Sequence, residues 1–223
     1  TNYYRNRVLK VAKEFRRKVH FAISNKDDFY NEIKEYGLEA QYDKRLDTPM
    51  VAAQGVYGEK YRMDEEFSVE NLKLFAENLL AGKLINYMKS EPIPARNDGP
   101  VKILVANNFK DVVDGKDSLI EIYAPWCGHC KALEPTFQKL GEKMKDEDIV
   151  IAKIDGTAND LPPGFSSQGF PTIYFKPKNG PPMMYQHGRE LENFVNFLAH
   201  VSTDELKGWT REGKKRKKSK KEL

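Results

Sequence analysis

The second half of the chain alternates between short apolar runs and segments with a helical period. The apolar runs are typical of buried strands, and apolar residues spaced three and four apart predict helices between them. Strands that alternate with helices, followed by two strands and a last helix, indicate an α/β fold with a mixed central sheet flanked by helices. The predicted strands are 101–105, 119–123, 149–154, 172–175 and 183–186, and the predicted helices are 107–113, 127–144 and 190–201.

The first half follows only the later part of this order. Its patterns predict helices over 2–15 and from Asp27 to Gly37, and a third helix that Ser68 caps and that ends near Gly82. We therefore expect a second domain of the same fold that lacks its opening strands, with Thr1 as a cut end. The predicted strands of this half are 19–23, 50–53 and 59–63, and its last helix is expected to bury Leu72, Phe75, Leu79 and Leu80.

Three prolines and a glycine interrupt every period between residues 89 and 100, which indicates a domain boundary. The sequence predicts a non-catalytic domain at 1–91, a linker at 92–100, a catalytic domain at 101–205 and a basic, disordered tail at 206–223.

The net charge of +4 belongs to the tail. Of 37 basic and 33 acidic residues, nine and two respectively lie in 207–223, so the remainder carries −3. This distribution argues against a nucleic-acid-binding fold, and no apolar run is long enough to span a membrane. The basic run from Lys214 to Lys221 is too polar to fold alone.

The chain holds only two cysteines, Cys127 and Cys130, at the junction of a predicted strand and helix. A helix N-terminus stabilises an anion, so Cys127 is expected to react as a thiolate, and Cys130 to resolve mixed disulfides. Between them lie Gly128 and His129, and His129 is expected to support the Cys127 thiolate. This pattern indicates a thioredoxin-like redox motif; the alternatives are half of a zinc site, for which a second cysteine pair is missing, and an inert structural disulfide.

Two charged residues interrupt apolar strands, Glu121 and Lys153. Burying either alone is costly, so we expect the two to pair across neighbouring strands, with Glu121 relaying the proton that Cys130 loses. The alternative is that both side chains point outward from edge strands.

The residues from Tyr123 to Lys131, Tyr-Ala-Pro-Trp-Cys-Gly-His-Cys-Lys, together with Gly-Phe-Pro-Thr at 169–172, resemble a catalytic domain of the protein disulfide isomerase family. Segments at 2–8, 65–68, 90–94 and 97–101 resemble the b′–a′ half of the family's glycoprotein-directed branch, which works with calnexin and calreticulin. The resemblance implies two thioredoxin-like domains in tandem.

The same resemblance implies a thiol–disulfide oxidoreductase and isomerase that acts on unfolded secretory proteins, with no metal and no cofactor besides the cysteine pair. It implies that Trp126, Phe170 and a cis Pro171 bind substrate. It also implies that Arg7, with Arg5 beside it, contacts a lectin partner; the alternative is that both are solvated helix charges. Two other functions are possible interpretations. In one, the first domain is a non-enzymatic chaperone or docking module; in the other, the protein is a cytosolic reductant.

Two features depart from the family pattern. Gln168 stands where the family commonly has an arginine that lowers the pKa of the second cysteine, so we expect slower reoxidation. The chain ends in Lys-Lys-Glu-Leu, which resembles an endoplasmic reticulum retention signal with Lys221 in place of an acid. We expect the endoplasmic reticulum lumen as the location; a nuclear localisation patch is the alternative.

Overall fold

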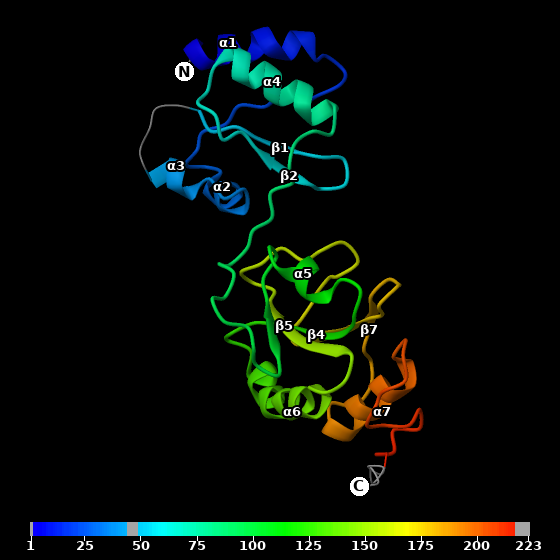
Figure 1. Ribbon diagram of the computed structural model, residues 1–223. Helices are drawn as coiled ribbons and strands as arrows, with labels where there is room; N and C mark the ends of the chain where they lie inside the picture. Colours follow the sequence, from blue (N-terminus) through cyan, green and yellow to red (C-terminus); the bar gives the residue numbers. More distant parts are fainter. Residues whose placement is uncertain (1, 44–48, 217–223) are drawn as a thin grey trace. The chain divides into compact units, whose positions relative to one another are not determined.

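The computed structural model describes residues 2–43 and 49–216. The chain divides into two compact units, Thr1–Lys89 and Ser90–Leu223, and each is described by itself (Figure 1).

The first unit is built around two long helices and one small sheet. The helices α1 and α4 lie side by side (Figure 1), and their packing buries Val11, Phe15, Leu72 and Ala76. The two strands form an antiparallel hairpin in which Ala53 lies opposite Tyr61. Its elements are α1 (Asn2–Glu14), α2 (Tyr30–Glu35), α3 (Glu39–Asp43), β1 (Ala52–Gln54), β2 (Lys60–Arg62) and α4 (Val69–Leu80).

In this unit the structure confirms the predicted helix cap but not the predicted strand at 19–23 or the burial of Leu80. Ser68 is the N-cap of α4, because its hydroxyl accepts a hydrogen bond from Asn71 N at 2.9 Å. Residues 19–23 form no strand, although Val19 and Phe21 pack against the core between α1 and α4. The predicted burial along α4 is wrong at its end, where Leu80 is 48% exposed.

The second unit contains a five-stranded sheet in the order β3-β5-β4-β6-β7. The strands β3, β5 and β4 run parallel, while β6 is antiparallel to β4 and β7 is antiparallel to β6. The central strand β4 therefore has a neighbour on both sides. The elements are β3 (Lys102–Leu104), α5 (Phe109–Val113), β4 (Asp117–Tyr123), α6 (Gly128–Met144), β5 (Ile149–Asp155), β6 (Thr172–Lys176), β7 (Met183–Met184) and α7 (Leu191–Val201).

Helices cover both faces of this sheet. Leu119 and Ile151 pack with Phe137 of α6 and Phe194 of α7 in one core cluster, whereas Ile120 packs with α5 in the other. Side chains alternate along a strand, so odd-numbered positions of β4 and β5 face α6. This arrangement confirms the predicted mixed sheet flanked by helices.

The segment predicted to be a linker packs on the second unit, and so does Glu91, which was predicted to end the first domain. Glu91 N donates to Asn159 Oδ1 at 2.9 Å, and Asn159 Nδ2 donates to the Glu91 carboxylate at 2.8 Å. The side chain of Asn97 bonds both the N–H and the carbonyl of Ile103. Residues from Ser90 onward therefore belong to this unit, because their polar groups are bonded to it.

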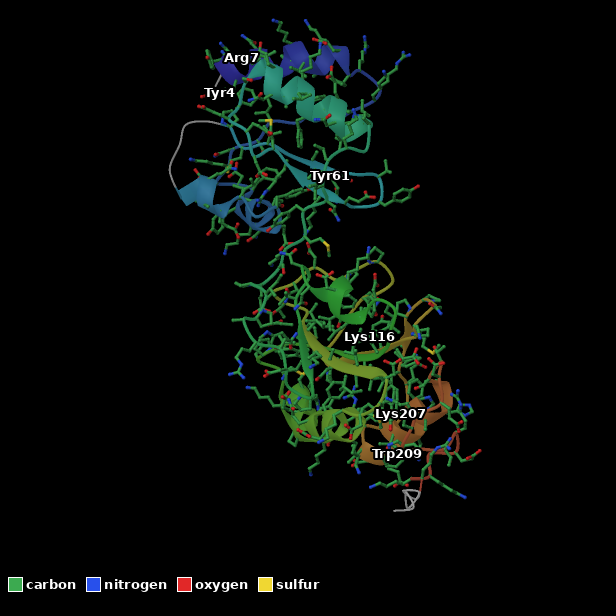
Figure 2. The ribbon with its side chains drawn as sticks, in the orientation of Figure 1. Tyr4, Arg7, Tyr61, Lys116, Lys207 and Trp209 are labelled. Carbon is green, nitrogen blue, oxygen red and sulfur yellow. The ribbon has the colours of Figure 1, made fainter. Side chains whose placement is uncertain are left out.

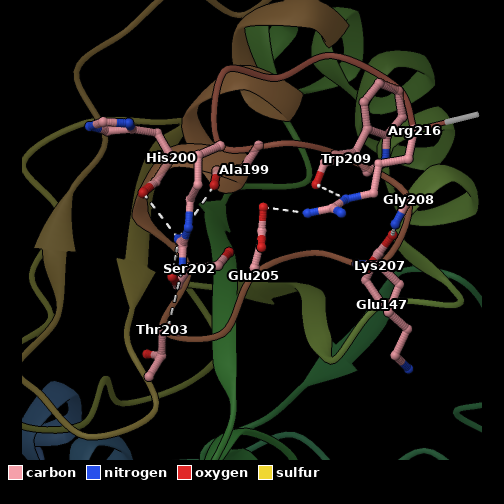
Figure 3. Close-up of polar contacts among 11 residues, drawn as sticks. Glu147, Ala199, His200, Ser202, Thr203, Glu205, Lys207, Gly208, Trp209 and Arg216 are labelled. Carbon is pink, nitrogen blue, oxygen red and sulfur yellow. Dashed lines mark hydrogen bonds and ion pairs between the residues drawn. The ribbon is translucent and has the colours of Figure 1, made fainter.

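The expectation of a disordered tail is wrong for residues 206–216 (Figure 3). The Arg211 guanidinium donates to carbonyls at the end of α7, the shortest bond being 2.6 Å to Ser202 O. Arg216 pairs with Glu205, and the Glu147 carboxylate accepts from two backbone N–H groups. These bonds hold the segment on the domain despite its charge. The final Lys-Lys-Glu-Leu lies outside the described residues.

None of the helices in the described part of the chain is long and apolar enough to cross a membrane.

Candidate active site

The first cysteine of the pair lies where β4 passes into α6. Cys127 is the N-cap of α6, and its Sγ accepts a hydrogen bond from Cys130 N at 3.2 Å. Cys127 Sγ also donates to Phe170 O at 3.4 Å. Both cysteines carry free thiols. A sulfur that already accepts a backbone N–H at a helix N-terminus is in a position that stabilises its thiolate form.

The second cysteine lies one turn into α6 and is only 5% exposed. Burial, a hydrogen bond with Cys127 and the charge of Glu121 raise the pKa of Cys130 to about 12. A thiol with this pKa keeps its proton near neutral pH. Cys130 therefore needs a base before it is able to act as a nucleophile.

A surface cavity of about 510 Å³ opens over Cys127. Trp126 is 71% exposed at this cavity and packs edge-on against Phe170, with 5.9 Å between the ring centroids. Gly128 and His129 line the same cavity, and so does Gln168. An exposed tryptophan that packs on a half-buried phenylalanine next to a reactive sulfur is able to contact apolar groups of an incoming polypeptide.

His129 is exposed, and the structure as described contains no hydrogen bond between it and Cys127. Its predicted support of the Cys127 thiolate stays a prediction. Within residues 2–43 and 49–216, no group of three or more His, Cys, Asp or Glu side chains is arranged to hold a metal ion.

The loop before β6 faces the dithiol through its backbone. The Phe170–Pro171 peptide bond is cis, and Phe170 O is the carbonyl to which Cys127 donates. The carbonyl of Pro171 accepts a hydrogen bond from the Arg189 guanidinium at 3.2 Å. Phe170 thus lies beside the cysteine pair, as the resemblance implied for this loop, and the substrate-binding role of Phe170 and Pro171 stays a prediction.

Glu121 is buried at the centre of the sheet and is 1% exposed. Its backbone lies opposite Lys153 in the register of β4 and β5, as the sequence predicted. The predicted ion pair between the two side chains is wrong. Neither oxygen of the Glu121 carboxylate has a hydrogen-bond partner among the residues that the structure describes.

Lys153 instead pairs with Glu134, a residue of α6 that the sequence analysis did not single out. Lys153 Nζ donates to both carboxylate oxygens of Glu134, at 2.7 and 2.8 Å. A helical spacing of seven residues from Cys127 placed Glu134 on the dithiol side of α6, and this was the only signal that pointed to it. The pairing was not predictable, because it joins a helix to a strand.

The isolated position of Glu121 changes its acid–base behaviour. Burial, followed by the negative charge of Glu134, raises the pKa of Glu121 from 4.5 to about 7. The positive charges of Lys153 and Arg189 act in the opposite direction but do not cancel this effect. Glu121 therefore exchanges its proton near neutral pH.

The two arginines predicted to bind a partner belong to α1 of the first unit. Figure 2 labels Arg7 on this helix. The guanidinium carbon of Arg7 lies 3.4 Å from the centroid of the Tyr3 ring, a cation–π contact. Arg5 is exposed.

Both units match models of the same fold. The family model described as thioredoxin matches residues 100–200, and the model described as a thioredoxin-like domain matches residues 1–78. The chain thus consists of two thioredoxin-like domains, the second of which carries the dithiol.

The similarity to individual proteins is more specific. The whole chain is 45% identical to protein disulfide-isomerase A3 of Gallus gallus, of which it covers 46%. It is 41% identical over 96% of its length to the probable protein disulfide-isomerase ER-60 of Schistosoma mansoni, of which it covers 45%. A solution structure of the first thioredoxin domain of mouse protein disulfide-isomerase A4 shares 36% identity, covers 51% of this chain and 83% of that one, and has a TM-score of 0.45. The chain belongs to the protein disulfide isomerase family and spans about half the length of the curated relatives it matches.

Proposed function

We propose that this chain is a thiol–disulfide oxidoreductase and isomerase that forms, breaks and rearranges disulfides in folding secretory proteins. The observation that carries the proposal is the position of Cys127, a free thiol at the N-cap of α6 that lines a surface cavity, with Cys130 one turn further into the helix. The names of the relatives support the same activity. In this proposal the electrons reside in the cysteine pair, and no cofactor or metal takes part.

The exchange proceeds in two steps. The Cys127 thiolate attacks one sulfur of a substrate disulfide, which forms a mixed disulfide and releases the other substrate sulfur as a thiolate. Cys130 then attacks Cys127 Sγ. The bond between Cys127 and the substrate breaks, the Cys127–Cys130 disulfide forms, and the substrate has gained two electrons while the protein has lost two. The reverse sequence donates a disulfide to a substrate dithiol.

Glu121 serves as the base for the second step in this proposal. The Cys130 thiol transfers its proton to the Glu121 carboxylate, and the resulting thiolate attacks. The charge of Glu121 acts on Cys130, and its pKa of about 7 suits a group that accepts a proton and returns it near neutral pH.

Reactivation of scrambled ribonuclease tests the function. Replacing Cys127 by serine removes the nucleophile, so Cys127→Ser is expected to reactivate the enzyme no faster than glutathione buffer alone. Cys130→Ser keeps the nucleophile and is expected to retain part of the isomerisation but to lose net insulin reduction. Trp126 and Trp209, the only tryptophans, report folding of the second unit by fluorescence. Reactivation by Cys127→Ser at the wild-type rate contradicts the proposal.

We further propose the endoplasmic reticulum lumen as the location and a lectin chaperone, calnexin or calreticulin, as a partner of the first unit, which corresponds in this proposal to the b′ domain of the relatives. The contact involves Arg7, held over Tyr3, and Arg5. In a pulldown with the luminal domain of calreticulin, Arg7→Ala is expected to weaken binding several-fold. Lys10→Ala, an exposed charge on the same helix, is the control and is expected to bind normally. Equal binding by both variants contradicts the partner assignment.

A further inference from the structure

The dithiol site contains two carboxylates and one ammonium group on the face of the sheet that α6 covers. Glu121 and Lys153 occupy opposite positions of the parallel strands β4 and β5, where an ion pair between them is the simplest outcome. Instead, Lys153 Nζ donates hydrogen bonds to both carboxylate oxygens of Glu134 on α6. Gln138, one turn further along α6, donates to the same carboxylate at 3.0 Å and fixes its orientation.

We propose that Glu134 is a positioning residue of this site: it holds Lys153 away from Glu121 and so keeps a buried carboxyl group without an ion-pair partner next to Cys130. This inference rests on the proposed function. Glu134 touches neither substrate nor a reacting sulfur in this scheme, and it acts only through Lys153 and Glu121.

The burial of the three groups supports this division of roles. Glu121 is 1% exposed, whereas the side chain of Glu134 is 41% exposed and that of Lys153 is 16% exposed. Burial raises the pKa of Glu134, but the hydrogen bonds from Lys153 and Gln138 outweigh it and lower the pKa. Glu134 therefore stays ionised and keeps its hold on the ammonium group at neutral pH.

Glu121 is surrounded by charged and titratable groups from three elements. Cys130 and Glu134 lie on α6, Lys153 lies on β5, and Arg189 lies just before α7. If Lys153 paired with Glu121, the carboxylate would be stabilised in its ionised form and would be a weaker base for the Cys130 proton. Because Lys153 pairs with Glu134 and not with Glu121, the Glu121 carboxylate remains basic enough to accept the Cys130 proton.

The experiment uses the reduced full chain mixed rapidly with an aromatic disulfide, dithiobis(nitrobenzoate). With only two cysteines in the chain, each molecule releases coloured thionitrobenzoate twice. The first release depends on reagent concentration and reports attack by Cys127. The second release is independent of reagent concentration and reports resolution by Cys130. Its rate as a function of pH gives the midpoint at which the base becomes available.

In Glu134→Gln, Lys153 is free to turn to Glu121, and the negative charge of Glu134, which raises the pKa of Glu121, is lost as well. The midpoint of the second release is expected to move toward acid by about one unit or more, with a several-fold lower plateau, while the first release is unchanged. In Glu134→Asp, which keeps the negative charge, the midpoint of the second release is expected to lie between those of wild type and Glu134→Gln. The double variant Glu134→Gln, Lys153→Met is expected to return the midpoint close to wild type, because the released ammonium group is gone.

Glu142→Gln is the matched control, since Glu142 is an exposed carboxylate further along α6. A wild-type midpoint in Glu134→Gln, or a double variant that stays shifted, overturns the inference about Glu134. If Glu134→Gln fails to fold by tryptophan fluorescence, Glu134→Asp supplies the same comparison, and an unshifted midpoint there overturns it too. Loss of both releases in the wild-type chain contradicts the proposed function itself, so the two failures are distinguishable.

Discussion

The two units match models of the same fold but differ in the size of their sheets and in the residues that these sheets bury. The described part of the first unit has two strands of three residues each, and its small core lies between α1 and α4. The second unit has five strands with a core cluster on each face. Among the residues that the structure describes, only the second unit contains strands with neighbours on both sides, and one of these, β4, carries Glu121 and leads directly to Cys127.

This difference shows what the dithiol chemistry requires of the fold. A carboxyl group is kept without partners only where the surrounding structure supplies enough packing to offset its burial. In the second unit, the central strand β4 has neighbours on both sides and places Glu121 inside the sheet, and α6 places Cys130 against it. The described part of the first unit offers helices and a hairpin, which suit surface contacts. Substitutions of core, site and helix-capping residues test this difference between the two units.

The largest effect is expected from the core of the second unit. Phe137 is 1% exposed and packs edge-on against Phe194, so Phe137→Ala is expected to lower the free energy of unfolding by about 3–5 kcal/mol. Because both tryptophans lie in this unit, urea denaturation followed by fluorescence isolates it. Leu72→Ala, in the core of the first unit, is expected to leave this transition unchanged. A shift by Leu72→Ala means that the units do not unfold independently.

A pH-dependent effect of intermediate size is expected from Glu121. Its pKa is raised on folding from 4.5 to about 7, so its contribution to stability is complete below pH 4.5 and is lost as the pH rises through 7. From pH 5 to pH 8, wild type is expected to lose about 2 to 3 kcal/mol of unfolding free energy relative to Glu121→Gln. Urea denaturation of both proteins at the two pH values measures this difference, and parallel pH dependences contradict it.

A smaller effect is expected from the first unit. Ser68→Ala removes the acceptor for Asn71 N and is expected to cost about 1 kcal/mol. Circular dichroism detects the loss because α4 is one of the long helices of this unit, whereas tryptophan fluorescence and thiol reactivity are expected to stay the same. Ser24→Ala, at an exposed position of the same unit, is the control. A change in thiol reactivity contradicts the separation of roles.

The smallest effect is expected at Gln168, which lines the cavity over Cys127. Gln168→Arg adds a positive charge near the dithiol and is expected to speed its oxidation by glutathione disulfide a few-fold, since an exposed charge is screened by solvent. Gln168→Met is the neutral control. Stopped-flow fluorescence of Trp126 follows the oxidation, and equal rates in wild type and Gln168→Arg contradict the expectation.

The sequence predicted the elements whose signals are local. The strand at 149–154 and the helix from about Cys127 formed almost as expected, and Ser68 capped its helix, because each depends on residues within a few positions. Residues 19–23 have the composition of a strand but form none, since a strand also needs a partner, which an apolar run does not specify.

The errors in the site and in the tail have one physical cause. Lys153 was able to pair with Glu121 or with Glu134, and it pairs with Glu134. Arg211 was able to bind water or the carbonyls at the end of α7, and it binds the carbonyls. Charge counts and periods do not resolve such choices, because the competing partners are distant in sequence. Composition correctly described the basic character of 206–216 but not the hydrogen bonds that hold it.

The bond from Cys127 Sγ to Phe170 O ties the loop before β6 to the redox state of the protein. A thiol donates this bond, whereas a sulfur in a disulfide has no proton to donate. Oxidation therefore vacates a backbone acceptor that the N–H of an extended peptide is able to occupy. By thermodynamic reciprocity, such a peptide favours the disulfide form by the same factor by which oxidation tightens its binding.

Titrating a cysteine-free peptide against the oxidised and the reduced chain measures this factor, and equal affinities contradict the linkage. If the chain donates disulfides as proposed, polypeptides that still lack a disulfide bind more tightly to its oxidised form and are released once the disulfide has been transferred.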